Sequence, residues 1–520
     1  MVIDFTQNRD SVDISYVTEN GKIEVDNVLL EPGSPNGFFR IVETTEEDPS
    51  KIPGLVSFYG NPLRKEPANR FNGLNFNEFL CHSIKDLNPV LYEKMRMLRE
   101  PKPYSVDIEV LPTDEFGYSD ATAAENPITS IQITNYDLTT VVFCTKNSKY
   151  ALGSELKEDD IMYIEAILKE AMGKYYYYGG ARCKDPIKFT IKEFENETEM
   201  LVSYIAAVNK YFHMTLGWNY YGYDVPYIFN RCKRKGLDVK KMSPKNCMAP
   251  VKNSVNISLE VPIEYPQHRM AIDYMNIFKG SELYRTLDNF SLDRCSEEVL
   301  NIHKVSYEGN LRKLYNDDYL RFIAYSLLDP ILVQLLNKET NLLSTYFFQS
   351  YYTELPYMKL NQNPISLSLI YKHLRDKGKF ICESEYPEKI SRQYIGAFVK
   401  QPTVHYVDSC MGEDFGSLYP NSMISCYLSF DNKVPDTIMM DDSGHPINEF
   451  NQKKFDKYRA ENCCITPMGR IYKRDDNNIY TSIEKGLLKQ RKEFKKPKED
   501  LYLNIIPMIQ QEIASRKNKH

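Results

Sequence analysis

Two acidic residues stand two positions apart in the run from Tyr104 to Val110, where polar and apolar side chains alternate. This alternation predicts a β-strand with Asp107 and Glu109 on one face and apolar side chains on the other. Paired carboxylates suit hard divalent cations, which take oxygen ligands, and they repel each other when no cation is near. Taken alone, such a pair is more often a solvated strand face than a metal site.

Two further segments place a carboxylate where it could do chemistry. Between Gly217 and Ile228, Asp224 stands among aromatic residues at an expected strand-loop-helix junction, with a helix N-cap as the alternative interpretation. Tyr325 and Asp329 are four residues apart, so they share one face of a helix, with a surface pair as the alternative. The three segments together supply four carboxylates and one tyrosine.

The elements around these residues predict one α/β domain. A boundary near residue 104 follows the Pro-rich 99–103 segment, and strand-like runs cover 104–110, 128–134 and 139–144. Helical periodicity covers 159–172, 197–211 and 319–336. The alternating 256–263 segment, bounded by polar residues and a proline, predicts a hairpin arm.

Length and composition indicate a large chain with several domains, and we expect these domains to be of α/β and α+β class. The chain has 520 residues, of which 42% are hydrophobic and 26% charged. No run approaches eighteen uncharged apolar residues and the N-terminus lacks a secretion pattern, so we expect no membrane partner and a cytoplasmic location. The net charge of −6 argues against nucleic-acid binding through net charge alone, although a basic channel remains compatible with it.

The three acidic segments resemble the exonuclease motifs of family B DNA polymerases, closest to the T-even-phage type. The resemblance implies an RNase H-like 3′–5′ exonuclease domain in which two Mg²⁺ or Mn²⁺ ions bind Asp107, Glu109, Asp224 and Asp329. It implies that Tyr325 orients the attacking water. It also implies that Trp218 and Asn219 contact the unpaired 3′ end of single-stranded DNA, although Trp218 could equally be a core residue.

A second resemblance begins at Asp414, where the 414–421 segment is similar to motif A of the family B polymerase palm. In the family, the matching aspartate binds the two catalytic magnesium ions, and neighbouring groups bind the incoming dNTP. The matching positions here are Asp414 for the metals and Phe415, Ser417, Leu418 and Tyr419 for the nucleotide. A plain turn before a helix is the alternative interpretation.

Two further segments resemble DNA and nucleotide contacts of the same family. The 394–397 segment matches the template-contacting Tyr-x-Gly-Gly/Ala pattern, which implies that Tyr394 and Gly396 bind DNA. The 490–495 segment resembles the first helix of the fingers, where Arg491 and Lys495, one turn apart, could bind the outer phosphates of dNTP. A solvated basic helix is the alternative.

The family's second fingers motif and its palm Asp-Thr-Asp string do not occur in these 520 residues. We therefore expect the N-terminal subunit of a split, phage-encoded polymerase that acts on primer-template DNA, in the host cytoplasm. A second polypeptide would supply the remaining fingers, palm and thumb, and could bind a sliding clamp. A truncated longer polymerase, an autonomous exonuclease whose palm remnant is a docking surface, and a non-enzymatic nucleic-acid-binding scaffold are the alternatives.

The resemblance also predicts the domain boundaries. We expect an N-terminal mixed α/β domain over 1–104, to which 341–390 return, and the exonuclease domain over 105–340. An incomplete palm would cover 391–480, and the first segment of the fingers would cover 481–520.

Overall fold

The computed structural model describes most of the chain and divides it into two compact units. The described residues are 2–7, 11–29, 38–57, 62–68, 89–97, 101–111, 119–150, 152, 156–177, 186–251, 263–353 without 282 and 285, 355, 357, 362–376, 379–380, 409, 411–439, 450–500, 503 and 506–509. One unit comprises residues 1–39 and 67–368, and the other comprises 40–66 and 369–520. The predicted domain boundaries stay predictions.

A six-stranded mixed sheet forms the centre of the first unit, with the strand order β10-β9-β8-β7-β11-β14. β7, β8 and β9 pair antiparallel, whereas β9 with β10 and β7 with β11 and β14 run parallel. The strands are β7 (Tyr104–Val110), β8 (Ile128–Thr134), β9 (Thr139–Thr145), β10 (Lys188–Phe194), β11 (Met214–Gly217) and β14 (Met270–Asp273). The predicted strands at 104–110, 128–134 and 139–144 are confirmed, as is the α/β class of this region.

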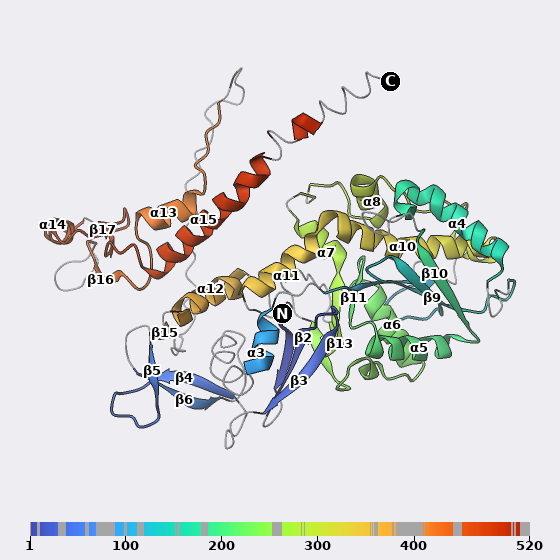
Figure 1. The fold of residues 1–520 in the computed structure, drawn as a ribbon, viewed down its shortest axis with the longest axis horizontal. Helices are drawn as coiled ribbons and strands as arrows, with labels where there is room; N and C mark the ends of the chain where they lie inside the picture. Colours follow the sequence, from blue (N-terminus) through green and yellow to red (C-terminus); the bar gives the residue numbers. More distant parts are fainter. Residues whose placement is uncertain are drawn as a thin grey trace. The chain divides into compact units, whose positions relative to one another are not determined.

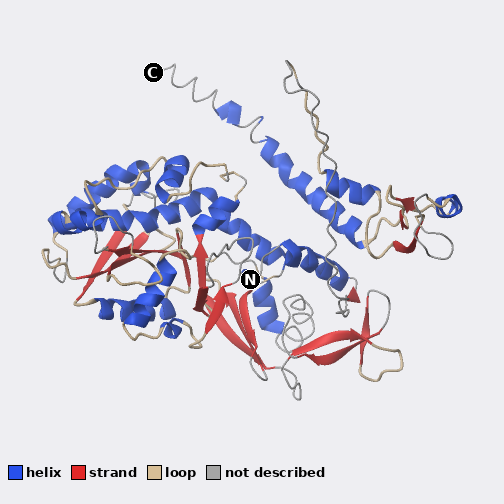
Figure 2. Cartoon of the chain, turned by 180° about the vertical axis from the view of Figure 1, so that it is seen from behind, coloured by secondary structure: helices blue, strands red, loops and turns tan. Residues whose placement is uncertain are grey.

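Helices cover both faces of this sheet (Figure 1). One face carries α4 (Glu158–Met172), α8 (Leu292–Leu300) and α10 (Tyr319–Thr340), and the other carries α5 (Glu197–Lys210) and α6 (Asp224–Arg234). Seen from behind, the strands again lie between the two helical layers (Figure 2). The predicted helices at 159–172, 197–211 and 319–336 therefore correspond to α4, α5 and α10.

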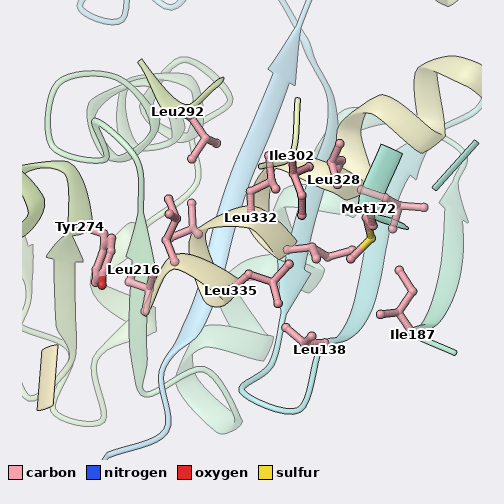
Figure 3. Packing of buried hydrophobic residues seen from close by; sticks show 14 of the residues in the cluster. Leu138, Met172, Ile187, Leu216, Tyr274, Leu292, Ile302, Leu328, Leu332 and Leu335 are labelled. Carbon is pink, nitrogen blue, oxygen red and sulfur yellow. The ribbon is translucent and has the colours of Figure 1, made fainter. Parts of the chain in front are cut away.

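α10 is apolar around most of its circumference because it is the central helix of a core. Among the described helices it alone has the length and hydropathy of a membrane-crossing segment, but 83% of that segment is buried inside the protein. Its leucines Leu328, Leu332 and Leu335 pack with Met172 of α4 and Leu216 of β11 (Figure 3). We therefore interpret α10 as a core helix, for which an all-round apolar surface is expected.

The two faces of β7 differ in chemistry. Val106, Ile108 and Val110 belong to the hydrophobic cluster formed with α5 and α6. Because successive strand side chains point to opposite faces, Asp107 and Glu109 lie on the face covered by α10. The predicted division of β7 into an apolar and an acidic face is confirmed.

The first unit contains further strands and helices besides this domain. β1 (Val2–Gln7), β2 (Ser11–Val17) and β3 (Ile23–Leu29) form an antiparallel sheet, and β12 (Met248–Val251) pairs antiparallel with β13 (Ile263–Pro266). The helices are α3 (Pro89–Arg96), α7 (Tyr274–Gly280), α9 (Leu311–Asp317), α11 (Leu342–Thr353) and α12 (Gln362–Asp376), of which α12 continues into the second unit. The predicted hairpin at 256–263 lies outside the described residues except for Ile263, at which β13 begins.

The described residues of the second unit include two small sheets and, after α12, further helices. One sheet has the order β15-β5-β6-β4 and the other β16-β18-β17. The strands are β4 (Phe38–Glu43), β5 (Lys51–Ser57), β6 (Pro62–Ala68), β15 (Lys379–Phe380), β16 (Lys433–Thr437), β17 (Cys464–Ile465) and β18 (Arg470–Tyr472). The helices are α13 (Leu418–Ser425), α14 (Gln452–Ala460) and α15 (Ile479–Asp500).

A buried ion pair fastens α5 and α6 to the loop that precedes β8. Glu197 accepts hydrogen bonds from Nε and Nη2 of Arg231 at 2.7 and 2.8 Å, and from the backbone N–H of Ile128 at 2.8 Å. Arg231 Nη1 donates to the carbonyl oxygens of Ala124 and Glu125. The pair is nearly enclosed, since only 7% of each of the two residues is exposed.

We expect Glu197→Gln to lower the unfolding free energy of the first unit by about 3 kcal/mol, because Arg231 would keep a buried charge without its counter-ion. Thermal unfolding measures the loss, and faster hydrogen exchange at the Ile128 amide locates it. Glu170→Gln, on the exposed surface of α4, is the control and should leave both unchanged. Equal stability of Glu197→Gln and Glu170→Gln would contradict the expected effect.

Candidate active site

The acidic face of β7 supplies the first two candidate residues. Glu109 is buried and Asp107 is half-buried, and both lie beneath α10. Directly opposite on β8 stand the buried polar residues Gln132, paired with Asp107, and Ser130, paired with Glu109. The acidic pair therefore lies in a polar layer inside the domain, and the alternative of a solvated strand face is wrong.

Asp224 reaches the same region because β11 runs parallel to β7. Leu216 of β11 pairs with Ser105 of β7, so the loop after β11 passes beside Asp107. Gly217 allows this loop to approach β7 closely, because glycine has no Cβ. A Cβ atom at this position would lie 2.5 Å from the Tyr220 ring and 3.0 Å from the carbonyl oxygen of Val106. α6 begins at Asp224, which is buried and follows the N-cap Tyr223, so Asp224 is not the N-cap.

Tyr325 and Asp329 lie one turn apart on α10, as their spacing predicted. Asp329 is buried and Tyr325 half-buried, and the Tyr325 ring meets Tyr307 edge to face at 5.3 Å. Ser105 donates a hydrogen bond to the carbonyl oxygen of Pro330 at 2.6 Å, which holds this stretch of α10 against β7. α10 therefore brings its carboxylate to the acidic face of the sheet rather than to the protein surface.

The pKa values of these groups indicate that the carboxylates lie close enough to repel one another. Burial raises the pKa of Asp107, and the charge of Asp329 raises it further. Burial and the charges of Asp107, Asp329 and Asp224 raise the pKa of Glu109. For Asp224 the pKa is raised by burial and by Asp107. Four carboxylates from three distant segments thus form one electrostatic cluster, which we call the acidic cluster.

Lys304 is a member of this site that the sequence did not indicate. Its Nζ forms an ion pair with Oδ2 of Asp329 at 2.5 Å and lies 5.6 Å from the centre of the Tyr325 ring. Burial alone would lower the pKa of the ammonium group, but Asp329, Asp107 and Glu109 together raise it. No local pattern distinguishes this lysine, because its partner is 25 residues away in the chain.

The donor atoms of the acidic cluster fit a divalent cation. All four side chains offer carboxylate oxygens, which hard cations prefer, and Oδ1 of Asp329 is buried without a hydrogen-bond partner. A bound cation would satisfy that oxygen and relieve the repulsion that raises the carboxylate pKa values. Among the described residues, no three His, Cys, Asp or Glu side chains are arranged as ligands of one ion, and Lys304 pairs with the other oxygen of Asp329. The chemistry of the donors therefore fits, and their assembly around an ion would require side-chain rotation.

Trp218 and Asn219 follow β11 and differ in their surroundings. The Trp218 indole N–H donates to the carbonyl oxygen of Phe290 at 2.9 Å, and its ring packs 5.7 Å from that of Phe278. Trp218 therefore has the core contacts that the alternative interpretation predicted. Asn219 is exposed, with a left-handed backbone at φ 57°. The predicted contact of both residues with DNA stays a prediction.

Residues 75–294 match the family described as DNA polymerase family B, exonuclease domain. Over this part of its sequence, the chain is similar to that family. Domains of this family generally use divalent metal ions, in agreement with the donors of the acidic cluster.

Three curated relatives are similar over parts of their length. The DNA-directed DNA polymerase of Enterobacteria phage T4 is 26% identical over 500 residues, which is 92% of this chain and 52% of the relative. That of Escherichia phage RB69 is 27% identical over 401 residues, or 75% of this chain and 41% of the relative. The DNA polymerase delta catalytic subunit of Candida albicans is 24% identical over 267 residues, or 48% of this chain and 26% of the relative. The chain thus spans about half the length of the phage relatives or less.

Outside the exonuclease domain, the second unit holds the motif A candidates on a turn before α13. Asp414 and Phe415 are exposed, Ser417 has a left-handed backbone at φ 54°, and α13 begins at Leu418. Residues 411–415 form no strand, and a turn before a helix follows Asp414, as in the alternative interpretation. A strand requires a hydrogen-bonded neighbour, and no described strand pairs with this segment.

Arg491 of α15 joins this turn from a distant part of the sequence. Its Nη1 donates to Oγ of Ser417 at 2.8 Å, across 74 residues of chain. Lys495 lies one turn further along α15, and both side chains are exposed. The structure therefore groups Arg491 with the motif A turn. Tyr394 and Gly396 lie outside the described residues.

We expect Mn²⁺ to raise the unfolding temperature of the exonuclease domain, because a cation that binds only the folded protein stabilises it. At about 100 times its dissociation constant, the stabilisation would be about 2.7 kcal/mol. Asp107→Asn with Glu109→Gln should abolish this increase and stabilise the metal-free protein, since two buried like charges are removed. Glu158→Gln with Asp159→Asn on α4 is the matched control. An equal Mn²⁺ effect on the two double variants would disprove the metal assignment.

Proposed function

We propose that this chain is a divalent-metal-dependent 3′–5′ exonuclease that removes nucleotides from DNA ends and so proofreads. The observation that carries the proposal is the convergence of Asp107, Glu109 and Asp224, which lie within the residues 75–294 that match the family B exonuclease domain, with Asp329 of α10, which lies beyond that match. The sheet order and the helices on both of its faces support an RNase H-like fold. Three of the similar proteins are named as DNA polymerases of two phages and of Candida albicans, which supports DNA as the substrate.

The four carboxylates of the acidic cluster would hold two Mg²⁺ or Mn²⁺ ions. Such ions activate water as a nucleophile and neutralise the charge that develops on the scissile phosphate. The arrangement of all four donors within one compact unit supports nuclease activity without a partner chain. The alternative of an autonomous exonuclease expects the same activity, and it differs in taking the second unit only as a docking surface.

The neighbouring side chains would position the reactants. Tyr325 lies one turn from Asp329, and its hydroxyl group would donate a hydrogen bond to the attacking water. Lys304 holds Asp329 through the ion pair and adds a positive charge beside the incoming phosphate. Asn219, exposed two residues after β11, would hydrogen-bond the terminal nucleotide.

We propose further that the second unit contributes part of a polymerase site. Asp414 would bind the catalytic magnesium ions, the turn from Phe415 to Tyr419 would hold dNTP, and Arg491 with Lys495 would bind its outer phosphates. The hydrogen bond from Arg491 to Ser417 supports the proposal that the turn and α15 bind one nucleotide together. The exposed apolar side chains Phe415, Leu418 and Tyr419 favour coverage by the remaining palm.

The remaining polymerase segments would complete this site from a second polypeptide or from a longer form of the chain. One palm carboxylate does not build a two-metal site, and the Asp-Thr-Asp string is not among the 520 residues. Primer-template DNA would bind only the completed enzyme productively. A sliding clamp would associate through the added part.

The protein should release mononucleotides from the 3′ end of single-stranded DNA in Mg²⁺ without a partner. Asp107→Ala with Glu109→Ala should lower the rate roughly a thousandfold or more, because the hydrolytic water would lose its activation. The measurement is digestion of a 5′-labelled oligonucleotide on a sequencing gel. Glu158→Ala with Asp159→Ala, the matched exposed pair, should digest at the wild-type rate. Unchanged digestion by the Asp107 and Glu109 variant would refute the proposed site.

Primer extension should require the addition of a polypeptide that carries the Asn-Ser-x-Tyr-Gly and Asp-Thr-Asp strings. In that mixture, Asp414→Asn should abolish extension and leave 3′–5′ digestion intact, because the two sites use different carboxylates. Extension of a primer by the 520-residue protein alone would show that the polymerase half of the proposal is wrong. It would not affect the exonuclease assignment.

A further inference from the structure

A pocket opens at the edge of the central sheet opposite to the acidic cluster. It measures about 480 Å³, including the part open to solvent, and four separate chain segments line it. They are the turn between β2 and β3, the start of β7, the turn between β8 and β9, and the start of β11. Because β7 and β11 run parallel and carry the acidic cluster towards their far ends, the pocket is separate from that cluster.

The walls of this pocket are held in place by hydrogen bonds. His213 Nδ1 accepts from the backbone N–H of Ile23 at 3.2 Å, and its Nε2 lies 3.0 Å from the carbonyl oxygen of Lys210, which fastens the β2–β3 turn to β11. Gly21 has a left-handed backbone at φ 73° and lies against Lys102. A Cβ atom added at Gly21 would lie 3.2 Å from the backbone nitrogen of Lys102. The Asn135 side chain accepts from the N–H groups of Asp137 and Thr139. The pocket is therefore formed before any ligand binds.

The side chains that line the pocket combine cations with aromatic rings. Lys22 and Lys102 are exposed at the rim, while Tyr104 and Tyr136 are half-buried. Two cations lie near the Tyr136 ring, since Lys338 Nζ is 3.7 Å and Lys102 Nζ is 6.0 Å from its centre. Burial and Arg269 lower the pKa of His213, so the positive charge of the pocket comes from its lysines.

This combination selects for one kind of ligand. Lysine ammonium groups bind phosphate through charge-assisted hydrogen bonds, and tyrosine rings stack on nucleobases of any sequence. Asn20, Asn135 and Asp137 add donors and acceptors for a base edge. A phosphate alone would use the lysines but leave the rings without a function, and an apolar ligand would leave the lysines unpaired.

We propose that this pocket binds a nucleotide, with its phosphate on Lys22 and Lys102 and its base on the tyrosine rings. The nucleotide is either free or part of a single strand. A free deoxynucleoside monophosphate is the chemical product of 3′–5′ digestion, and a strand would gain a second anchor on the far edge of the sheet. The assignment rests on the pocket alone and does not require the exonuclease proposal.

Lysine acetylation of the full chain in EDTA tests the proposal at the site itself. Mass spectrometry reads the reactivity of Lys22 and Lys102 without ligand, with dAMP, with oligothymidylate and with inorganic phosphate. We expect at least about threefold protection of both lysines by a nucleotide ligand and little by phosphate, because stacking contributes to binding. Protection by dAMP identifies a site for free nucleotides, and protection by oligothymidylate alone identifies a strand site.

Binding measurements with variants provide the second readout. Lys22→Ala with Lys102→Ala should weaken binding of the protecting ligand about tenfold or more, and Tyr136→Ala should weaken it at least about fivefold. Lys188→Ala with Lys233→Ala removes the same charge from exposed positions elsewhere and should bind like the wild type. The proposal fails if neither nucleotide ligand protects the two lysines, or if the two double variants bind equally.

Discussion

The first unit depends on the burial of like charges beneath an apolar helix. Asp107, Glu109, Asp224 and Asp329 lie within electrostatic reach of one another, and burial raises the pKa of the first three. An uncompensated buried charge costs several kcal/mol, so the fold needs a strong opposing contribution. α10 provides it, because Phe322, Ile323, Leu327, Leu328, Ile331, Leu332, Leu335 and Leu336 are fully buried and each contributes about 1.5–3 kcal/mol.

The negative charge of the acidic cluster is only partly neutralised by neighbouring side chains, so the site attracts cations. Lys304 neutralises one oxygen of Asp329, while the other oxygen is buried without a partner. The remaining carboxylates have no described lysine or arginine in an ion pair with them. A site with excess buried negative charge binds divalent cations with a gain in stability, because each cation removes repulsion that the fold otherwise carries.

The central sheet separates two kinds of chemistry along its strands. One end of β7 and β11 carries the acidic cluster, and the other end carries the pocket with Lys22 and Lys102. The opposite charges produce an electric field along the strands. This field attracts an anionic polymer to the lysines and repels it from the metal-free acidic cluster. In the second unit, the hydrogen bond of Arg491 to Ser417 joins two segments that are far apart in the sequence and that we propose to form one nucleotide site.

The sequence alone determined the local geometry of the site. Alternation in β7 put Asp107 and Glu109 on one face, and the four-residue spacing put Tyr325 beside Asp329, because strand and helix periods follow from backbone geometry. The family resemblance then joined the segments, and the match over 75–294 agrees with it. Only the tertiary structure decided that Lys304 pairs with Asp329, that Trp218 packs against Phe278, and that Lys102 approaches Tyr136. Such contacts depend on sheet order and helix packing, which bring together residues that no local period relates.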